Sequence, residues 1–257
     1  MFNLMHNQSG RFKITDKDNE DVDLLRQLDE IFISKKGYVV KMPDKGSVVA
    51  ACMSGGLDST ANLAILMEEY GYEVFPFFIN RGQSAYKEER AAVDWYDRFF
   101  KERYPKLYHT VTEISVATPA AEYKDMLRDT KNAMTDDEQC KNISYPARNP
   151  IIFLSGMEFA YSLKSKGKEI KTVFASHVSS DGSYHCSQTW TRGLNLQMCQ
   201  IMNDWDWQFI SIPIETAFGN YFDKDVYIRF CHEHGIPLKY TRTCVKTGVP
   251  CGSCPPC

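Results

Sequence analysis

Apolar and polar positions alternate along the chain in blocks that predict strands followed by helices. Short apolar runs predict buried strands, and stretches with apolar residues three or four positions apart predict amphipathic helices. Beyond residue 46 the predicted strands cover 48–53, 73–79, 107–114, 170–176 and 208–212, and the predicted helices cover 58–70, 85–103, 118–142, 150–166, a segment ending near 203, and 223–234. This order is typical of an α/β fold with a mostly parallel sheet and helices on both faces.

Residues 1–46 have a different character, because they are polar and rich in charge. They contain one amphipathic stretch, Leu24 to Ile33, and a short strand-like segment, Tyr38 to Met42. We interpret residues 1–46 as an N-terminal extension, 47–243 as one α/β domain, and 244–257 as a small cysteine-rich lobe. A chain of 257 residues is long enough for one such domain with appendages.

Charge and composition narrow the class of partner. The chain has 30 basic and 33 acidic residues, a formal net charge of −3, so no overall basic field attracts nucleic acid. A small molecule or a protein is therefore the expected substrate. No apolar run approaches the ~18–20 residues of a membrane span, and the first residues lack the pattern of a signal peptide. We expect a cytoplasmic protein, in which nine cysteines indicate metal binding or catalysis rather than disulfides.

The segment Ser54-Gly55-Gly56-Leu57-Asp58-Ser59 lies between the predicted strand 48–53 and the predicted helix that follows. Glycines let the backbone approach an anion, the two serines offer hydroxyls, and a helix N-terminus offers unpaired N–H groups. The pattern predicts a phosphate-binding loop, although a glycine turn capped by Ser or Asp is the simpler alternative. It is not a Walker A motif, because no Gly-Lys-[Ser/Thr] follows.

Four of the nine cysteines lie together at the end of the sequence: Cys244, Cys251, Cys254 and Cys257. Two overlapping Cys-x-x-Cys steps and a spacer of six residues suit a tetrahedral set of thiolates around Zn²⁺. We predict a structural zinc, because four protein thiolates leave no open position for water. An iron–sulfur cluster is the alternative for the same residues.

These motifs together resemble a known family. Ser54 to Ser59 is similar to the loop of the PP-loop ATP pyrophosphatases (adenine nucleotide alpha hydrolase-like), which cut ATP between its α and β phosphates. With Arg81-Gly82-Gln83, Glu89, the run 145–149 and the four cysteines, the chain from about 47 to 257 resembles the 7-cyano-7-deazaguanine synthase (QueC-like) family. The resemblance implies ATP and Mg²⁺ as cofactors and Zn²⁺ as a structural metal. It also implies that 7-carboxy-7-deazaguanine is activated at its carboxylate, amidated by ammonia and dehydrated to the nitrile.

The resemblance also implies roles for single residues. Ser54, Gly55, Gly56, Leu57, Asp58 and Ser59 would bind the ATP phosphates, and Asp58, Arg148 and Lys224 would be catalytic. Asp58 would orient loop amides or hold Mg²⁺, with helix capping as its alternative role. Arg148 would direct its guanidinium at phosphate or carboxylate, with a surface ion pair as the alternative. Lys224 would face the phosphates or be a solvated lysine at a helix start. The position of Asn149 directly before the helix expected from Pro150 suits an N-cap.

One loop departs from the family pattern. Where the family carries Ser-Gly-Tyr-Pro-Asp-Cys-Arg, this chain has residues 181–187, with His185 in place of the carboxylate and Ser187 in place of the guanidinium. The loop follows a predicted strand, so we expect it at the same end of the sheet as the ATP loop. The later tryptophans, Trp190, Trp205 and Trp207, are expected in the core rather than stacked on a base.

These departures leave the acceptor of the activated carboxylate open. One alternative is a ligase that couples the activated deazaguanine to an amine on a protein partner, as in a divergent relative with a role in antiviral defence. A tRNA-thiolating PP-loop enzyme is a third candidate, which the balanced charge disfavours, and a nucleotide-binding regulatory module without turnover is a fourth. Exposed aromatic stretches lead us to expect a homodimer.

Overall fold

The computed structural model describes residues 13–135, 148–244 and 248–253. Their sheet has five strands, β1 (Val48–Cys52), β2 (Glu73–Asn80), β3 (Thr112–Ser115), β4 (Thr172–Ala175) and β5 (Gln208–Ser211). The strand order is β3-β2-β1-β4-β5, and every neighbouring pair is parallel. From β1 the chain proceeds to β2 and β3 on one side and then returns to place β4 and β5 on the other. In such sheets ligands bind where the strand order reverses, here beyond the carboxyl ends of β1 and β4.

The helices follow the predicted alternation with the strands. They are α1 (Val22–Lys36), α2 (Leu57–Glu68), α3 (Tyr86–Arg103), α4 (Lys124–Asn132), α6 (Arg148–Ser162), α7 (Gln188–Met202) and α8 (Lys224–Glu233). Short 3-10 turns occupy Ile14–Asp16, Ala121–Tyr123, Leu163–Lys166, Tyr184–Cys186, Ile212–Ile214, Thr216–Phe218 and Leu238–Tyr240.

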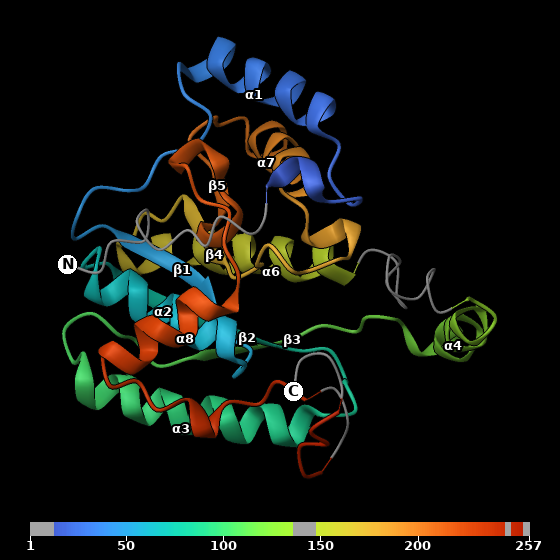
Figure 1. The fold of residues 1–257 in the computed structure, drawn as a ribbon. Helices are drawn as coiled ribbons and strands as arrows, with labels where there is room; N and C mark the ends of the chain where they lie inside the picture. Colours follow the sequence, from blue (N-terminus) through green and yellow to red (C-terminus); the bar gives the residue numbers. More distant parts are fainter. Residues whose placement is uncertain (1–12, 136–147, 245–247, 254–257) are drawn as a thin grey trace.

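Two apolar cores lie on opposite faces of the sheet. Residues of α2, α3 and α8 pack with one face, where Leu63, Val93 and Phe230 are fully buried. Residues of α6 and α7 pack with the other face, together with Phe32 of α1. Figure 1 shows α1 lying outside α7 as the outermost element on that side. The predicted α/β fold, a parallel sheet with helices on both faces, is therefore confirmed.

Three predicted elements differ from the structure. The strand predicted over 107–114 is reduced to β3, and only Tyr108 makes an isolated bridge to Val74 of β2. The ladder is interrupted because the carboxylate of Asp97 accepts the hydrogen bond of the Val111 N–H at 2.9 Å. The segment Tyr38 to Met42 is not a strand, because the side-chain amide of Gln208 pairs with the backbone N–H and C=O of Lys41.

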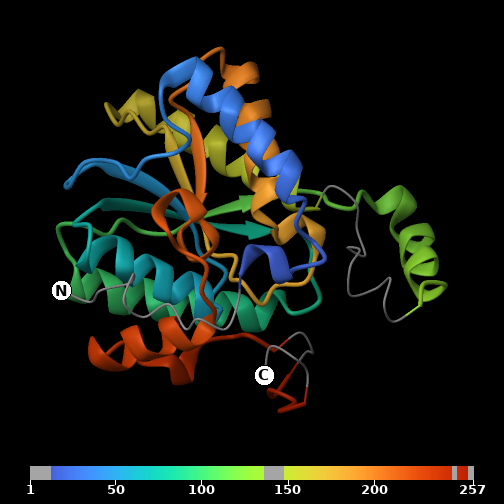
Figure 2. The same cartoon turned by 45° about the horizontal axis from the view of Figure 1, so that its top comes forward.

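The helix predicted over 118–142 is also much shorter in the structure. It consists of the turn Ala121–Tyr123 and helix α4, and residues 136–142 lie outside the described residues. Helix α4 buries none of its side chains, so no apolar face holds it against the domain. Figures 1 and 2 both show α4 apart from the sheet and its covering helices.

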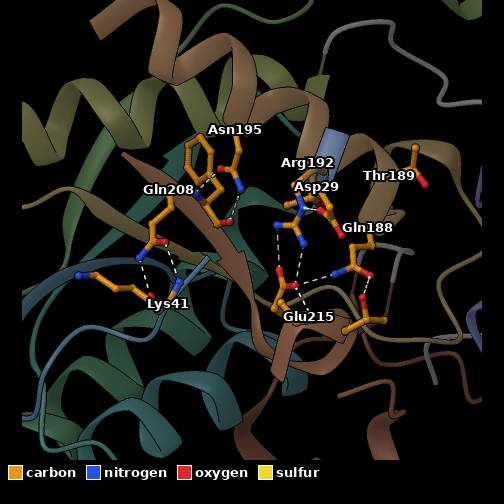
Figure 3. Close-up of polar contacts among 12 residues, drawn as sticks. Asp29, Lys41, Gln188, Thr189, Arg192, Asn195, Gln208 and Glu215 are labelled. Carbon is orange, nitrogen blue, oxygen red and sulfur yellow. Dashed lines mark hydrogen bonds and ion pairs between the residues drawn. The ribbon is translucent and has the colours of Figure 1, made fainter. Parts of the chain in front are cut away.

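Side-chain amides complete the backbone pairing of β5. Asn195 of α7 donates its amide to the carbonyl of Phe209 at 3.0 Å, and its carbonyl oxygen accepts the N–H of the same residue. Figure 3 shows this pair beside the contacts between Gln208 and Lys41.

In the described parts of the chain, no helix has the length and apolar content needed to cross a lipid bilayer.

Candidate functional site

The glycine loop leaves β1, the central strand, and enters α2 directly. Its two serines close the loop on itself: the Oγ atoms of Ser54 and Ser59 lie 3.0 Å apart, and the Ser54 N–H donates to the Ser59 hydroxyl at 3.1 Å. The Gly56 N–H donates to the Ser54 hydroxyl at 3.3 Å. A short loop with internal hydrogen bonds is pre-organised, so little ordering remains when an anion binds.

Both glycines are needed by the geometry. Gly55 has φ of +76°, and a Cβ placed on it would lie 3.0 Å from both the Glu89 carbonyl oxygen and the Ala92 Cβ. Gly56 is the N-cap of α2 and has no side chain to accept the first N–H groups of the helix. Neither Ser nor Asp therefore caps α2, contrary to the alternative of a capped turn. The N-terminus of α2 is left available to an anion.

Asp58 lies in the first turn of α2 and pairs with Lys224, the first residue of α8. The Lys224 Nζ is 3.6 Å from Asp58 Oδ2. Burial raises the pKa of Asp58 to about 6, although the nearby Lys224 charge opposes this effect. Asp58 Oδ1 is buried and has no hydrogen-bond partner among the described residues. A carboxylate with an unused buried oxygen beside a phosphate loop can bind a cation or a donor group.

A second part of the site begins at Arg148, the first residue of α6. Its Nη2 lies 3.1 Å from His185 Nε2, and its Nε donates to the Asn149 side chain at 3.2 Å. The Asn149 amide in turn donates to the His185 carbonyl at 3.3 Å. Asn149 is therefore not the expected N-cap, since it lies inside the helix and holds the 181–187 loop. The surface ion pair given as the alternative role of Arg148 is also absent from the described residues, where the guanidinium contacts a histidine instead.

Two neutral histidines lie close to that guanidinium. Burial and the positive charge of Arg148 lower the pKa of His185 to about 3 and that of His177 to about 4. His185 is therefore neutral near pH 7, and its Nε2 accepts the hydrogen bond from Arg148. Because His185 is neutral, it does not compensate the positive charge of Arg148. The guanidinium therefore remains suited to an anionic ligand.

The two parts of the site share one cavity of about 250 Å³. Ser54 of the phosphate loop and Arg148 both line it, together with Arg81, Gln83 and Glu89. A cavity of about 450 Å³ shares Arg81 and Arg148 with it and adds Lys124 and Lys131 of α4. Four basic side chains line these two cavities, which favours a ligand with several negative charges.

Glu89 is the acidic residue of this cavity. It accepts a hydrogen bond from the Gln83 amide at 2.7 Å, and burial raises its pKa. Sequence reasoning quoted Arg81, Gln83 and Glu89 as parts of the family pattern without giving them roles, and it missed His177. The signal that could have found Arg81 and Gln83 is their position directly after β2, at the same end of the sheet as Ser54.

The loop after β4 crosses from one part of the site to the other. Asp181 lies close enough to Asp58 for its charge to contribute to the raised pKa of Asp58, whereas His185 contacts Arg148. Ser187 is buried and is the N-cap of α7, where its hydroxyl accepts the Trp190 N–H at 3.0 Å. It thus serves the helix rather than a ligand. Trp207 is buried in the core as expected, whereas Trp190 and Trp205 are partly buried and pack against it.

Only half of the predicted zinc site lies within the described residues. The Sγ atoms of Cys244 and Cys251 are 3.6 Å apart, and the Cys251 N–H points to the Cys244 sulfur at 3.4 Å. This spacing fits two ligands of one tetrahedral metal, since Zn–S bonds are about 2.3 Å long. Cys254 and Cys257 lie outside the described residues, and within these no group of three metal-ligating side chains occurs. The distance between the Cys244 and Cys251 sulfurs fits zinc, and the zinc site itself stays a prediction.

Comparisons with known proteins found a matching family, a curated relative and a similar solved structure. The family described as queuosine biosynthesis protein QueC matches residues 48–257. A curated relative, 7-cyano-7-deazaguanine synthase 1 of Desulfitobacterium hafniense (strain Y51), is 24% identical over 213 residues, which cover 80% of this chain and 87% of the relative. Among solved structures, the U34-tRNA thiolase NcsA from Methanococcus maripaludis with its [4Fe-4S] cluster is 16% identical, with a TM-score of 0.40 and coverage of 90% of this chain and 67% of that chain. Since the family match includes β1, the phosphate loop and every later strand, this chain belongs to the QueC family.

Proposed function

We propose that this protein uses ATP to activate the carboxylate of a 7-carboxy-7-deazaguanine-type substrate and then transfers the acyl group to an amine. The observation that carries the proposal is the shared cavity, lined by Ser54 of the phosphate loop on one side and by Arg148 on the other. A carboxylate held there would lie beside the ATP phosphates. Membership of the QueC family supports this choice of substrate class.

The phosphate loop would bind ATP through its backbone. The N–H groups at the start of α2 would hold the phosphates, and Lys224 would add positive charge. The unused Oδ1 of Asp58 suits Mg²⁺, a hard cation that prefers carboxylate oxygens and would neutralise charge on the phosphates. Lys224 would keep Asp58 ionised while leaving this oxygen free.

Arg148 and Arg81 would hold the substrate carboxylate and orient it for reaction. One carboxylate oxygen attacks the α-phosphorus, the bond to the β-phosphate oxygen breaks, and pyrophosphate leaves. The amine then attacks the acyl carbon, AMP leaves with the electrons of the carbon–oxygen bond, and the attacking nitrogen loses a proton to solvent. A poor electrophile is thereby converted into a reactive mixed anhydride, and the product is an amide.

The acceptor in this proposal is ammonia, with an amine on a protein partner as the second candidate. The second candidate is favoured by the 181–187 loop, which lacks the carboxylate and the guanidinium of the family pattern. In their places stand His185, which is neutral, and Ser187, which serves as a helix cap. A tRNA-thiolating reaction gains no support from the site. Burial raises the pKa of Cys52 to about 12 and also raises that of Cys186, so neither thiol provides a reactive thiolate near pH 7.

The test supplies the protein with ATP, 7-carboxy-7-deazaguanine and ammonium and follows nucleotide and base products by mass spectrometry. AMP and pyrophosphate should appear together with the amide or nitrile. Release of ADP would contradict the proposal. Asp58→Ala should reduce turnover by about a hundredfold, as expected for loss of an oriented charged group. A parallel reaction with a candidate partner protein in place of ammonium, analysed for a mass increase on the protein, distinguishes the two acceptors.

A further inference from the structure

The loop between β4 and α7 is held by residues that lie outside the family match. The match begins at residue 48, whereas Asn19 and Glu20 belong to the N-terminal extension. Asn19 is only 8% exposed, and its amide nitrogen donates to the carbonyl oxygens of Asp181 and Ser183, both at 3.0 Å. One side chain from the extension thus fixes two carbonyls near the start of the loop.

The next residue fixes the other end of the loop. The two carboxylate oxygens of Glu20 accept the backbone N–H groups of Gln188 at 2.7 Å and Thr189 at 3.0 Å. Glu20 also accepts the Thr189 hydroxyl at 2.8 Å. These are the first N–H groups of α7, which have no partner within the helix, and a carboxylate at a helix N-terminus is favoured by the helix dipole. Asn19 and Glu20 together therefore clamp both ends of residues 181–189.

The segment that carries these two residues is itself anchored to the core. Arg192 of α7 is fully buried and donates to Asp29 of α1 at 2.7 Å. Its other nitrogens donate to the buried carboxylate of Glu215 at 2.7 and 3.2 Å. Figure 3 shows Arg192 between these two carboxylates, with Gln188 also directed at Glu215. Breaking this ion pair would leave an unpaired charge in the interior, so the pair fixes the position of α1 against α7.

The clamped loop touches both parts of the candidate site. Its Asp181 lies near Asp58, and its His185 accepts the hydrogen bond of Arg148. A displacement of the loop would move His185 and would change the direction of the Arg148 guanidinium. The phosphate loop, in contrast, is held by β1 and by its own serines and does not depend on the extension.

We infer that Asn19 and Glu20 are positioning residues, which set the 181–189 loop and through His185 and Arg148 determine how the substrate carboxylate is bound. The extension is then a functional part of the site. The kinetic part of this inference rests on the proposed function, whereas the position of the loop can be measured on the protein alone.

The experiment compares Glu20→Gln and Asn19→Ala with the control Glu30→Gln, which makes the same chemical change at an exposed position of α1. Glutamine has the shape of glutamate but one acceptor oxygen, so it places an NH₂ group against a backbone N–H. Hydrogen exchange of the amides in 181–190 should be about tenfold faster in both test variants and unchanged in the control. Exchange in β1 and α2 should remain at the wild-type rate.

The kinetic readout separates positioning from general stability. For Glu20→Gln we expect KM for 7-carboxy-7-deazaguanine to rise about tenfold, with kcat and KM for ATP within about twofold of wild type. Wild-type exchange in 181–190, equal acceleration over the whole protein, or an unchanged KM for the carboxylate would each overturn the inference. If wild-type protein does not turn over this carboxylate, the proposed function fails, and the exchange of 181–190 alone decides whether Asn19 and Glu20 hold the loop.

Discussion

The ammonium group of Lys224 lies 3.6 Å from the carboxylate of Asp58, although 166 positions separate the two residues in the sequence. Each stands in the first turn of a helix, α2 or α8. The pairing leaves the second oxygen of Asp58 buried without a partner in the described residues, and burial raises the pKa of this carboxyl to about 6. The ionised form of Asp58 is therefore destabilised in the folded protein and available for a ligand that compensates its charge.

Asp58→Asn should reduce ATP cleavage and change the pH dependence of stability. The folded pKa lies above the unfolded value of ~3.9, so the folded protein binds more protons between about pH 4 and pH 6. The raised pKa of Asp58 therefore adds to the stability of wild type at low pH, and this added stability is lost as pH rises through about 6. Asparagine does not titrate, so the Tm difference, Asp58→Asn minus wild type, should increase between pH 4 and pH 7. Scanning calorimetry measures it, with the exposed Asp23→Asn as control; a pH-independent difference would contradict the raised pKa.

His185→Asp should weaken binding of an anionic substrate. An aspartate at this position would form an ion pair with Arg148 and neutralise the charge that we assign to substrate binding. KM for the carboxylate should rise about tenfold, while His185→Asn, which still offers an oxygen to Arg148, should stay near wild type. Steady-state kinetics with both variants test this. Equal KM values for the two would show that Arg148 does not bind the substrate through its charge.

Gly55→Ala and Gly56→Ala should have different effects on stability. Gly55 has φ of +76° and no room for a Cβ beside the Glu89 carbonyl, so alanine there should cost about 1–3 kcal/mol of stability. Gly56 has φ of −79°, and its added Cβ would meet only the Ser54 hydroxyl at 3.3 Å and the Arg242 carbonyl at 3.5 Å. Urea denaturation should therefore show a clear loss for Gly55→Ala and a smaller one for Gly56→Ala. Equal losses would argue against the loop conformation.

The protein should contain one zinc ion per chain, bound by Cys244, Cys251, Cys254 and Cys257. Because a thiolate site is absent from the unfolded chain, metal binding adds to the free energy of folding, and a strong chelator should lower Tm. Elemental analysis should show zinc in wild type and its loss in the double variant Cys254→Ser, Cys257→Ser. The buried Cys231 is the matched control, since Cys231→Ala should retain the metal. Iron with sulfide, or metal retained by the double variant, would contradict the zinc site.

The sequence predicted those elements best in which local pattern and burial agree. The run 48–53 is apolar because β1 is central and covered on both faces, and the glycine loop follows from its place between a strand and a helix. Asp58 and Lys224 could be named from the family pattern, but their pairing depends on how α8 packs beside α2. The pattern of apolar and polar residues along the sequence does not show how these two helices pack.

The roles of short polar segments could not be predicted from sequence. Asn149 follows the pattern of a helix cap, yet its amide is used by a carbonyl 36 positions away. Asn19 and Glu20 lie in a polar stretch with no motif, and their partners lie more than 160 positions later. Such contacts are decided by tertiary packing, which overrides local preference.

The side-chain amide of Asn195 caps part of the outer edge of the sheet. Within the described residues, strand β5 pairs with β4 and lies at the edge of the sheet. An edge strand with open backbone groups can recruit a strand from another molecule and start aggregation. Asn195 occupies the Phe209 N–H and C=O that would make this contact. The backbone hydrogen-bonding groups of Phe209 are thereby closed to a strand from a second copy of the chain.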